Sequence, residues 1–202
     1  MNAQTEKFQL PGPSGELECA VDTPSSGPAC GLAVLAHPHP LHGGTMDNKV
    51  VQTLARAFVQ RGWRTLRFNF RGVGRSQGGW DAGRGEIDDM MAVIDQCRQN
   101  GEPLALGGFS FGAYVASHAA WRLGEPVTHL VLVGPATGNF QVAPVPAHTV
   151  VIHGELDEVV PLQSTLDWAR PQHLPIVVVP GVGHFFHGQL PLLKTLVLRA
   201  LA

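Results

Sequence analysis

The chain has few cysteines, little net charge and no long apolar run, and each shortage excludes a class of protein. Its three cysteines (Cys19, Cys30 and Cys97) are an odd number without C-x-x-C spacing, so we expect reduced thiols. Lys and Arg number 14 and Asp and Glu number 16, and this net charge of −2 provides no basic surface for nucleic acid or anionic lipid. No apolar stretch is long enough to span a membrane, and the polar residues 1–9 do not resemble a signal peptide. We therefore expect a cytoplasmic protein with no nucleic-acid or membrane partner.

What is present is an alternation of short apolar runs and helical segments, in a length that suits one domain over residues 1–202. Strands are expected at 16–22, 31–36, 63–70, 103–106, 128–133, 149–152 and 175–179, and helices at 48–61, 87–99, 113–123, 162–169 and 189–201. Most of the strands are continuously apolar, which indicates burial on both faces. The sequence thus predicts an α/β fold with a mostly parallel sheet and helices on both faces, and a site at the carboxyl ends of its strands.

One strand-to-helix connection carries a reactive side chain. Ser110 lies in the pattern G-x-S-x-G formed by residues 108–112, between an apolar strand and a helix. A serine held clear of a sheet requires a sharp, strained turn, and Gly108 and Gly112 remove the Cβ atoms that would collide there. The helix that follows points its N-terminus at the serine and favours negative charge on a bound oxygen. Ser110 is therefore the candidate nucleophile.

A serine hydroxyl needs a base, and His184 is the favoured candidate among ten histidines. It follows the last predicted strand after two glycines, whereas His187 is three residues further on and is the alternative. Four other histidines fall within helices or at strand starts, where a structural role is expected: His118, His129, His148 and His173.

The imidazole in turn needs a carboxylate, and three acidic residues follow the strand that ends at residue 152. Asp157 is favoured because apolar neighbours, Leu156 and Val159, suit a turn that directs it inward. Glu155 and Glu158 are expected to be solvated. The resulting chain order is Ser, Asp, His, which is typical of one particular fold.

Two backbone N–H groups are expected to hold a developing oxyanion. The first belongs to Phe111, directly after the nucleophile. The second must come from the loop after residue 36, in which Pro38 and Pro40 have no N–H. His39 and Leu41 remain, and His39 is favoured.

The chain resembles the α/β-hydrolases, in particular the small lidless bacterial members similar to dienelactone hydrolases and carboxylesterases. Five motifs carry the resemblance in the family's order: His37-Pro38-His39-Pro40 with residues 43–49, residues 68–76, Gly108 to Gly112, His153-Gly154 through Asp157 to Pro161, and His184 to His187. The resemblance implies a serine hydrolase without a cofactor that cleaves a small-molecule acyl ester or thioester through an acyl-enzyme.

Two departures from the family pattern bear on the substrate. Dienelactone hydrolases carry cysteine where this chain has Ser110, so their substrate does not transfer. Residues 134–146 are too few for the helical cap of lipase-like relatives, which predicts a shallow, open pocket.

Other interpretations compete with this one. His37, His39 and His42 form H-x-H-x-x-H, which also occurs in metal-dependent barrels, but the chain is too short for such a barrel and we expect no metal. Gly72 and Gly74 do not complete a dinucleotide loop and are interpreted as turn residues lining the site, and Arg71 and Arg75 as solvated. An amidase or acyltransferase using the same three residues, or a binding module without catalysis, remains an alternative.

Overall fold

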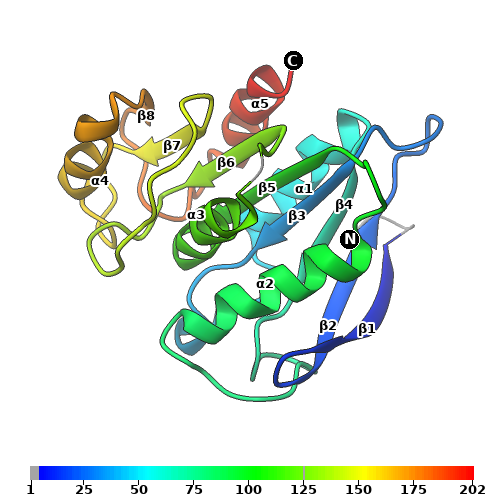
Figure 1. Ribbon diagram of the computed structural model, residues 1–202. Coiled ribbons are helices and arrows are strands. Elements are labelled where there is room, and N and C mark those ends of the chain that lie inside the picture. Colours follow the sequence, from blue (N-terminus) through cyan, green and yellow to red (C-terminus); the bar gives the residue numbers. More distant parts are fainter. Residues whose placement is uncertain (1–4, 125) are drawn as a thin grey trace.

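The computed structural model describes residues 5–124 and 126–202, which form a central sheet of eight strands with the order β1-β2-β4-β3-β5-β6-β7-β8 (Figure 1). The strands are β1 Glu6–Gly12, β2 Gly15–Asp22, β3 Leu32–Ala36, β4 Arg64–Phe68, β5 Leu104–Phe109, β6 His129–Val133, β7 Val150–Gly154 and β8 Ile176–Val179. β1 and β2 pair antiparallel, as do β2 and β4, and every other neighbouring pair is parallel. The predicted α/β class with a mostly parallel sheet is confirmed.

Helices cover both faces of the sheet. They are α1 Lys49–Gln60, α2 Arg84–Cys97, α3 Phe111–Leu123, α4 Leu162–Ala169 and α5 Leu190–Ala200, with short 3-10 turns η1 Pro40–His42 and η2 Arg170–Gln172. Apolar side chains of α2, α3 and α4 belong to the core on one face, and those of α1 and α5 to the core on the other, as the ribbon in Figure 1 also shows.

The buried central strands explain this two-sided core. All five residues of β3 are buried, and they alternate between the two cores: Val34 packs on the side of α2 and α3, and Leu35 on the side of α1. Successive side chains of a strand point to opposite faces, so a continuously apolar strand supplies both layers at once. The same strands bring their carboxyl ends to one edge of the sheet.

The N-terminal edge differs from the prediction. The strand expected at residues 16–22 is present as β2, but β1 precedes it and forms the edge of the sheet through a tight hairpin that pairs Gly12 with Gly15. β1 escaped detection because four of its seven residues are exposed, which is typical of an edge strand and leaves little apolar pattern.

Two of the helices, α2 and α3, start earlier than predicted. α2 begins at Arg84, within the expected loop, because the Glu86 carboxylate accepts the N–H groups of Asp81 and Gly83 and so fixes the first turn. α3 begins at Phe111, directly after Ser110.

Arg71 corrects the expectation of a solvated side chain. It is buried, and its Nη2 lies 2.7 Å from Oδ1 of the fully buried Asp89 on α2. The Arg71 backbone N–H also donates to Asp89 Oδ2 at 3.0 Å. The ion pair therefore anchors the loop after β4 to α2.

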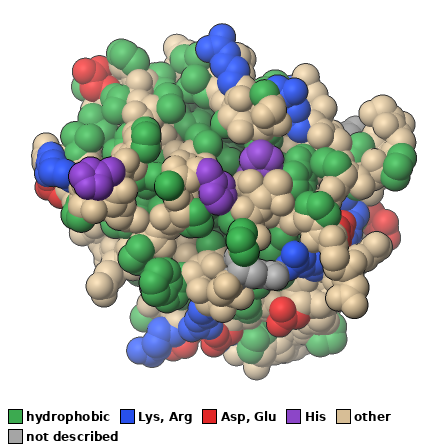
Figure 2. All heavy atoms as spheres, turned by 45° about the horizontal axis from the view of Figure 1, so that its top comes forward, with side chains coloured by type: hydrophobic (Ala, Val, Ile, Leu, Met, Phe, Trp, Pro, Cys, Tyr) green, Lys and Arg blue, Asp and Glu red, His purple; other side chains and the backbone are tan. Residues whose placement is uncertain are grey.

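The face of the molecule drawn in Figure 2 carries no strong charge pattern. On the face drawn in Figure 2, acidic and basic side chains are scattered among apolar and polar ones. The three cysteines are free thiols. None of the helices in residues 5–124 and 126–202 combines the length and the apolar character needed to cross a membrane.

Candidate active site

Ser110 occupies a strained turn between β5 and α3. Its backbone has φ 56° and ψ −117°, a region that residues other than glycine rarely adopt. A Cβ on Gly108 would lie 2.1 Å from the carbonyl oxygen of Gly112, and a Cβ on Gly112 would lie 2.2 Å from the carbonyl oxygen of Ala36 at the end of β3. Gly108 thus allows the chain to close on itself, as predicted, whereas Gly112 allows α3 to lie against β3.

Asp157 and His184 meet at the same edge of the sheet, from the loops after β7 and β8. His184 Nδ1 lies 2.6 Å from Asp157 Oδ2, and both side chains are buried. The second carboxylate oxygen, Oδ1, accepts the backbone N–H groups of Val159 at 2.9 Å and Val160 at 2.7 Å. Because the carboxylate faces Nδ1, that nitrogen carries the proton, and His184 Nε2 is left as the free base.

The electrostatics of Asp157 favour its ionised form. Burial raises the pKa of this carboxyl, but the hydrogen bonds from His184 and Val160 outweigh burial and hold its pKa below the usual range. Leu156 and Val159 are both exposed, so apolar neighbours do not explain why Asp157 points inward. The hydrogen bonds from the N–H groups of Val159 and Val160 hold the Asp157 side chain inward.

The competing candidates lie elsewhere. Glu155 and Glu158 are exposed; Glu155 accepts the N–H of Gly181 at 2.8 Å, and Glu158 accepts the backbone N–H of His184 at 3.4 Å. His187 is exposed and its ring lies 5.7 Å from that of Phe185. Both carboxylates therefore brace the loop that carries His184 without touching its ring.

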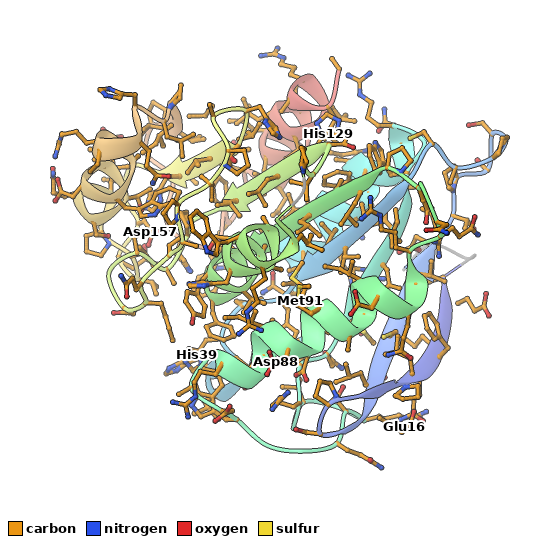
Figure 3. All side chains as sticks on the ribbon, in the orientation of Figure 1. Glu16, His39, Asp88, Met91, His129 and Asp157 are labelled. Atoms are coloured by element: carbon orange, nitrogen blue, oxygen red, sulfur yellow. The ribbon has the colours of Figure 1, made fainter. Side chains whose placement is uncertain are left out.

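A cavity of about 620 Å³ connects these elements. Ser110 and His184 both line it, together with Phe111, His39 and Phe140 among others. Figure 3 shows His39 and Asp157 toward the carboxyl ends of the strands, whereas His129, for which a structural role was expected, lies at the opposite edge. Gly72 and Gly74 are turn residues, as expected, but they do not line this cavity: a Cβ on Gly74 would meet the side chains of Asn69 and Glu18.

Two backbone N–H groups are available at this cavity. Among the described residues, no hydrogen bond uses the N–H of His39 or of Phe111, and both residues line the cavity. The N–H of Leu41 instead donates to His39 Nδ1 at 3.2 Å, and the Leu41 side chain is 66% exposed. Of the two alternatives for the second oxyanion donor, the geometry therefore favours His39.

The H-x-H-x-x-H histidines do not converge on a metal-binding geometry. His37 Nδ1 lies 2.6 Å from the carbonyl oxygen of Pro38, and its Nε2 accepts the N–H of Phe70 at 3.1 Å, so neither nitrogen is free. Burial lowers the pKa of His37 to about 3. Within residues 5–124 and 126–202, no group of three or more His, Cys, Asp or Glu side chains is arranged to hold a metal ion.

His153 is a residue of this region to which the sequence assigned no role. It is fully buried in β7, and its Nε2 lies 3.0 Å from the carbonyl oxygen of Val160 and 3.4 Å from Asp157 Oδ2. Because Nε2 faces the carbonyl oxygen of Val160, the proton is on Nε2, and no described residue offers a hydrogen-bond partner to the buried Nδ1 of His153. Burial lowers the pKa of His153, so the ring is neutral beside the carboxylate. The signal available in the sequence was a histidine at the end of a buried strand, immediately before the loop of Asp157.

The fold is that of an α/β-hydrolase without a cap domain. The structure is similar to a lidless α/β serine hydrolase from Xanthomonas campestris (37% identity, 99% of this chain and 94% of that chain covered, TM-score 0.91). It is also similar to an α/β serine hydrolase homologue from Coxiella burnetii (39% identity, 98% and 97% covered, TM-score 0.86). An uncharacterised protein of Rickettsia prowazekii is 34% identical over 191 residues, which span 87% of this chain and 79% of that protein.

The family model described as serine aminopeptidase, S33, matches residues 39–161. The chain belongs to this family of α/β-hydrolases. The resemblance drawn from the five sequence motifs is thereby confirmed at the level of the superfamily.

Proposed function

We propose that the protein is a serine hydrolase that cleaves small acyl esters or thioesters through Ser110, His184 and Asp157. One observation carries the proposal: the 2.6 Å contact between His184 Nδ1 and Asp157 leaves Nε2 without a hydrogen bond to any described residue, and His184 lines the same cavity as Ser110. A buried, ionised carboxylate fixes the tautomer of the base and stabilises the imidazolium that forms when the base takes a proton.

The proposed reaction has two halves. Ser110 Oγ attacks the acyl carbonyl while His184 Nε2 accepts its proton, and the N–H groups of Phe111 and His39 hold the resulting oxyanion. The carbon–oxygen or carbon–sulfur bond of the substrate then breaks, and His184 protonates the departing alcohol or thiol. A water molecule next loses a proton to His184 and attacks the acyl carbon. The bond between that carbon and Ser110 Oγ then breaks, the acid leaves, and His184 returns the proton to Ser110 Oγ.

The charge of the cavity wall favours uncharged substrates. Among the described residues, none of the 14 that line the cavity is Asp, Glu, Lys or Arg. The ammonium group of a peptide N-terminus would find no carboxylate there, and the phosphates of a coenzyme A thioester would find no Lys or Arg. An uncharged ester therefore fits the cavity better than either, although the family description names an aminopeptidase.

The test is the activity of Ser110→Ala on p-nitrophenyl acetate. We expect kcat to fall by orders of magnitude, on the order of 10⁶ in a well-studied triad, and labelling by a fluorophosphonate probe to disappear. Ser25→Ala, at an exposed loop position, is the matched control. A Ser110→Ala enzyme that keeps most of its activity would refute the proposal, and a wild-type chain that neither labels nor hydrolyses esters would favour a binding module.

A further inference from the structure

The wall of the cavity around Ser110 is rich in rings as well as free of ionic side chains. Six of the residues that line it carry an aromatic ring: His39, His42, Phe111, Phe140, His184 and Phe185. Aromatic side chains favour aromatic ligands, because the attraction between ring faces and ring edges adds to the free energy gained by burying apolar area. A substrate group that contains an uncharged ring suits such a wall.

His39 brings a polar group to this wall, and its tautomer follows from its neighbours. Nδ1 accepts the N–H of Leu41, so the proton of the neutral ring is on Nε2. Burial, and then the charge of His42, lower the pKa of His39, which keeps the ring neutral at neutral pH. Among the described residues, no group bonds to Nε2, so this nitrogen is a free donor.

Packing fixes the orientation of that donor. The His39 ring centroid lies 4.6 Å from that of Trp80, 5.2 Å from that of Phe111 and 5.9 Å from that of Phe140. The ring centroid of His42 also lies 4.6 Å away, and the N–H of Leu41 bonds to Nδ1 of the His39 ring. A donor held in this way loses little conformational entropy when it binds a ligand.

We propose that the His39 imidazole is a specificity-determining donor, and that it selects esters whose acyl group carries an uncharged ring with a hydrogen-bond acceptor oxygen. This inference rests on the proposed esterase function. The backbone N–H of the same residue is the proposed second oxyanion donor. His39 would therefore bind the reacting carbonyl through its backbone and the acyl ring through its side chain. An acceptor on the acyl ring pairs with Nε2, whereas an apolar group of equal size leaves that donor unpaired.

The experiment compares p-nitrophenyl phenylacetates that carry either a methoxy or an ethyl group at the ortho, meta or para position of the ring. The two groups have the same size, and the methylene of the phenylacetyl group insulates the carbonyl from their electronic effects. We expect one methoxy isomer to exceed its ethyl counterpart in kcat/KM by about threefold to tenfold, the range of one neutral hydrogen bond. A hemiester that places a carboxylate in the acyl group is expected to be slower than both.

Two variants of His39 separate its two nitrogens, and both keep the backbone N–H. His39→Asn places an oxygen near the position of Nδ1, which retains the Leu41 cap, but removes the Nε2 donor; we expect the methoxy preference to fall to within twofold of unity. His39→Gln places an amide N–H near the position of Nε2 and is expected to keep most of the preference. Because a ratio of two substrates is measured in each variant, a common loss of rate cancels.

A second measurement uses the wild-type protein and needs no variant. In histidine-labelled wild type, ¹⁵N NMR should show His39 with a protonated Nε2 and a bare Nδ1. A bare Nε2, a methoxy preference that survives in His39→Asn, or no preference in an enzyme that hydrolyses p-nitrophenyl acetate through Ser110 would overturn the inference and leave the esterase function standing. Absence of any Ser110-dependent hydrolysis would overturn both.

Discussion

Gly108 offers a direct test of why the turn at Ser110 can form. An alanine there would place its Cβ 2.1 Å from the carbonyl oxygen of Gly112, 2.2 Å from its carbonyl carbon and 2.6 Å from the nitrogen of Ala113. All three are backbone atoms of the first turn of α3, so no flexible side chain can move aside. The first turn of α3 must shift away from β5 by more than 1 Å to reach an ordinary contact distance.

The size of the effect follows from that shift. Overpacking a well-packed interior costs about 1–3 kcal/mol, and a clash with backbone belongs at the upper end. For a chain of this length, 3 kcal/mol corresponds to a fall of roughly 6–12 °C in the melting temperature. Displacing the N–H of Phe111 and the hydroxyl of Ser110 by 1 Å should also lower kcat by about 10²-fold.

The assay is thermal unfolding followed by circular dichroism, together with kcat on p-nitrophenyl acetate. Gly79→Ala is the matched control, because a Cβ at Gly79 lies within 4 Å of no atom of a described residue. The melting temperature of this variant should change by no more than about 2 °C. A Gly108→Ala protein that unfolds and turns over like the control would show that the turn does not depend on this close approach.

Three further perturbations address the residues around the turn. Asp157→Asn should lower kcat by about 10⁴-fold, as in a triad that loses the correct tautomer, whereas Glu155→Gln should cost little in the same assay; the reverse order would mean that the carboxylate is misassigned. His153→Leu leaves the Val160 carbonyl without its donor and should lower kcat about tenfold with KM little changed, while His153→Gln, which can still donate, should lose less; equal losses would contradict a positioning role. His37 has a folded pKa of about 3 against an ordinary value of 6.5, so stability is full above pH 6.5 and falls by about 1.4 kcal/mol per pH unit below it; in urea unfolding at a series of pH values, His37→Gln should flatten that slope by one proton, and an unchanged slope would refute the assignment.

The central layers could be predicted from sequence because local signals and the fold agree there. The apolar run of β3 indicates a strand covered on both faces, and the alternation of its side chains fills the two cores. G-x-S-x-G predicts a sharp turn at Ser110, and the positive φ of that residue confirms the turn. The position of Asp157 and His184 after neighbouring strands is what brings their side chains together.

The sequence was least informative where a contact joins distant elements or where a surface has no apolar pattern. From the sequence, Arg71 is a charged residue in a loop, and nothing nearby in the chain indicates a partner. Its partner, Asp89, lies on α2, a helix that begins earlier than predicted. Asp157 was chosen for its apolar neighbours, yet the N–H groups of Val159 and Val160 hold it. β1 lies at the edge of the sheet, where its mostly exposed residues leave little apolar pattern.

Four histidines at this edge of the sheet show why residue type alone could not assign their roles. Both nitrogens of His37 are bonded to backbone, so it anchors a loop and cannot act as a base. His39 has Nδ1 capped and Nε2–H free, so it can donate but not accept. His153 donates its Nε2 proton to the carbonyl of Val160, beside the Asp157 carboxylate, and burial keeps the ring neutral. His184 directs Nδ1 at that carboxylate and retains a free lone pair on Nε2. Of the four, only this last arrangement combines an available lone pair with a carboxylate that stabilises the resulting cation, and it is the occupied nitrogen of each ring that decides the chemistry left to the other.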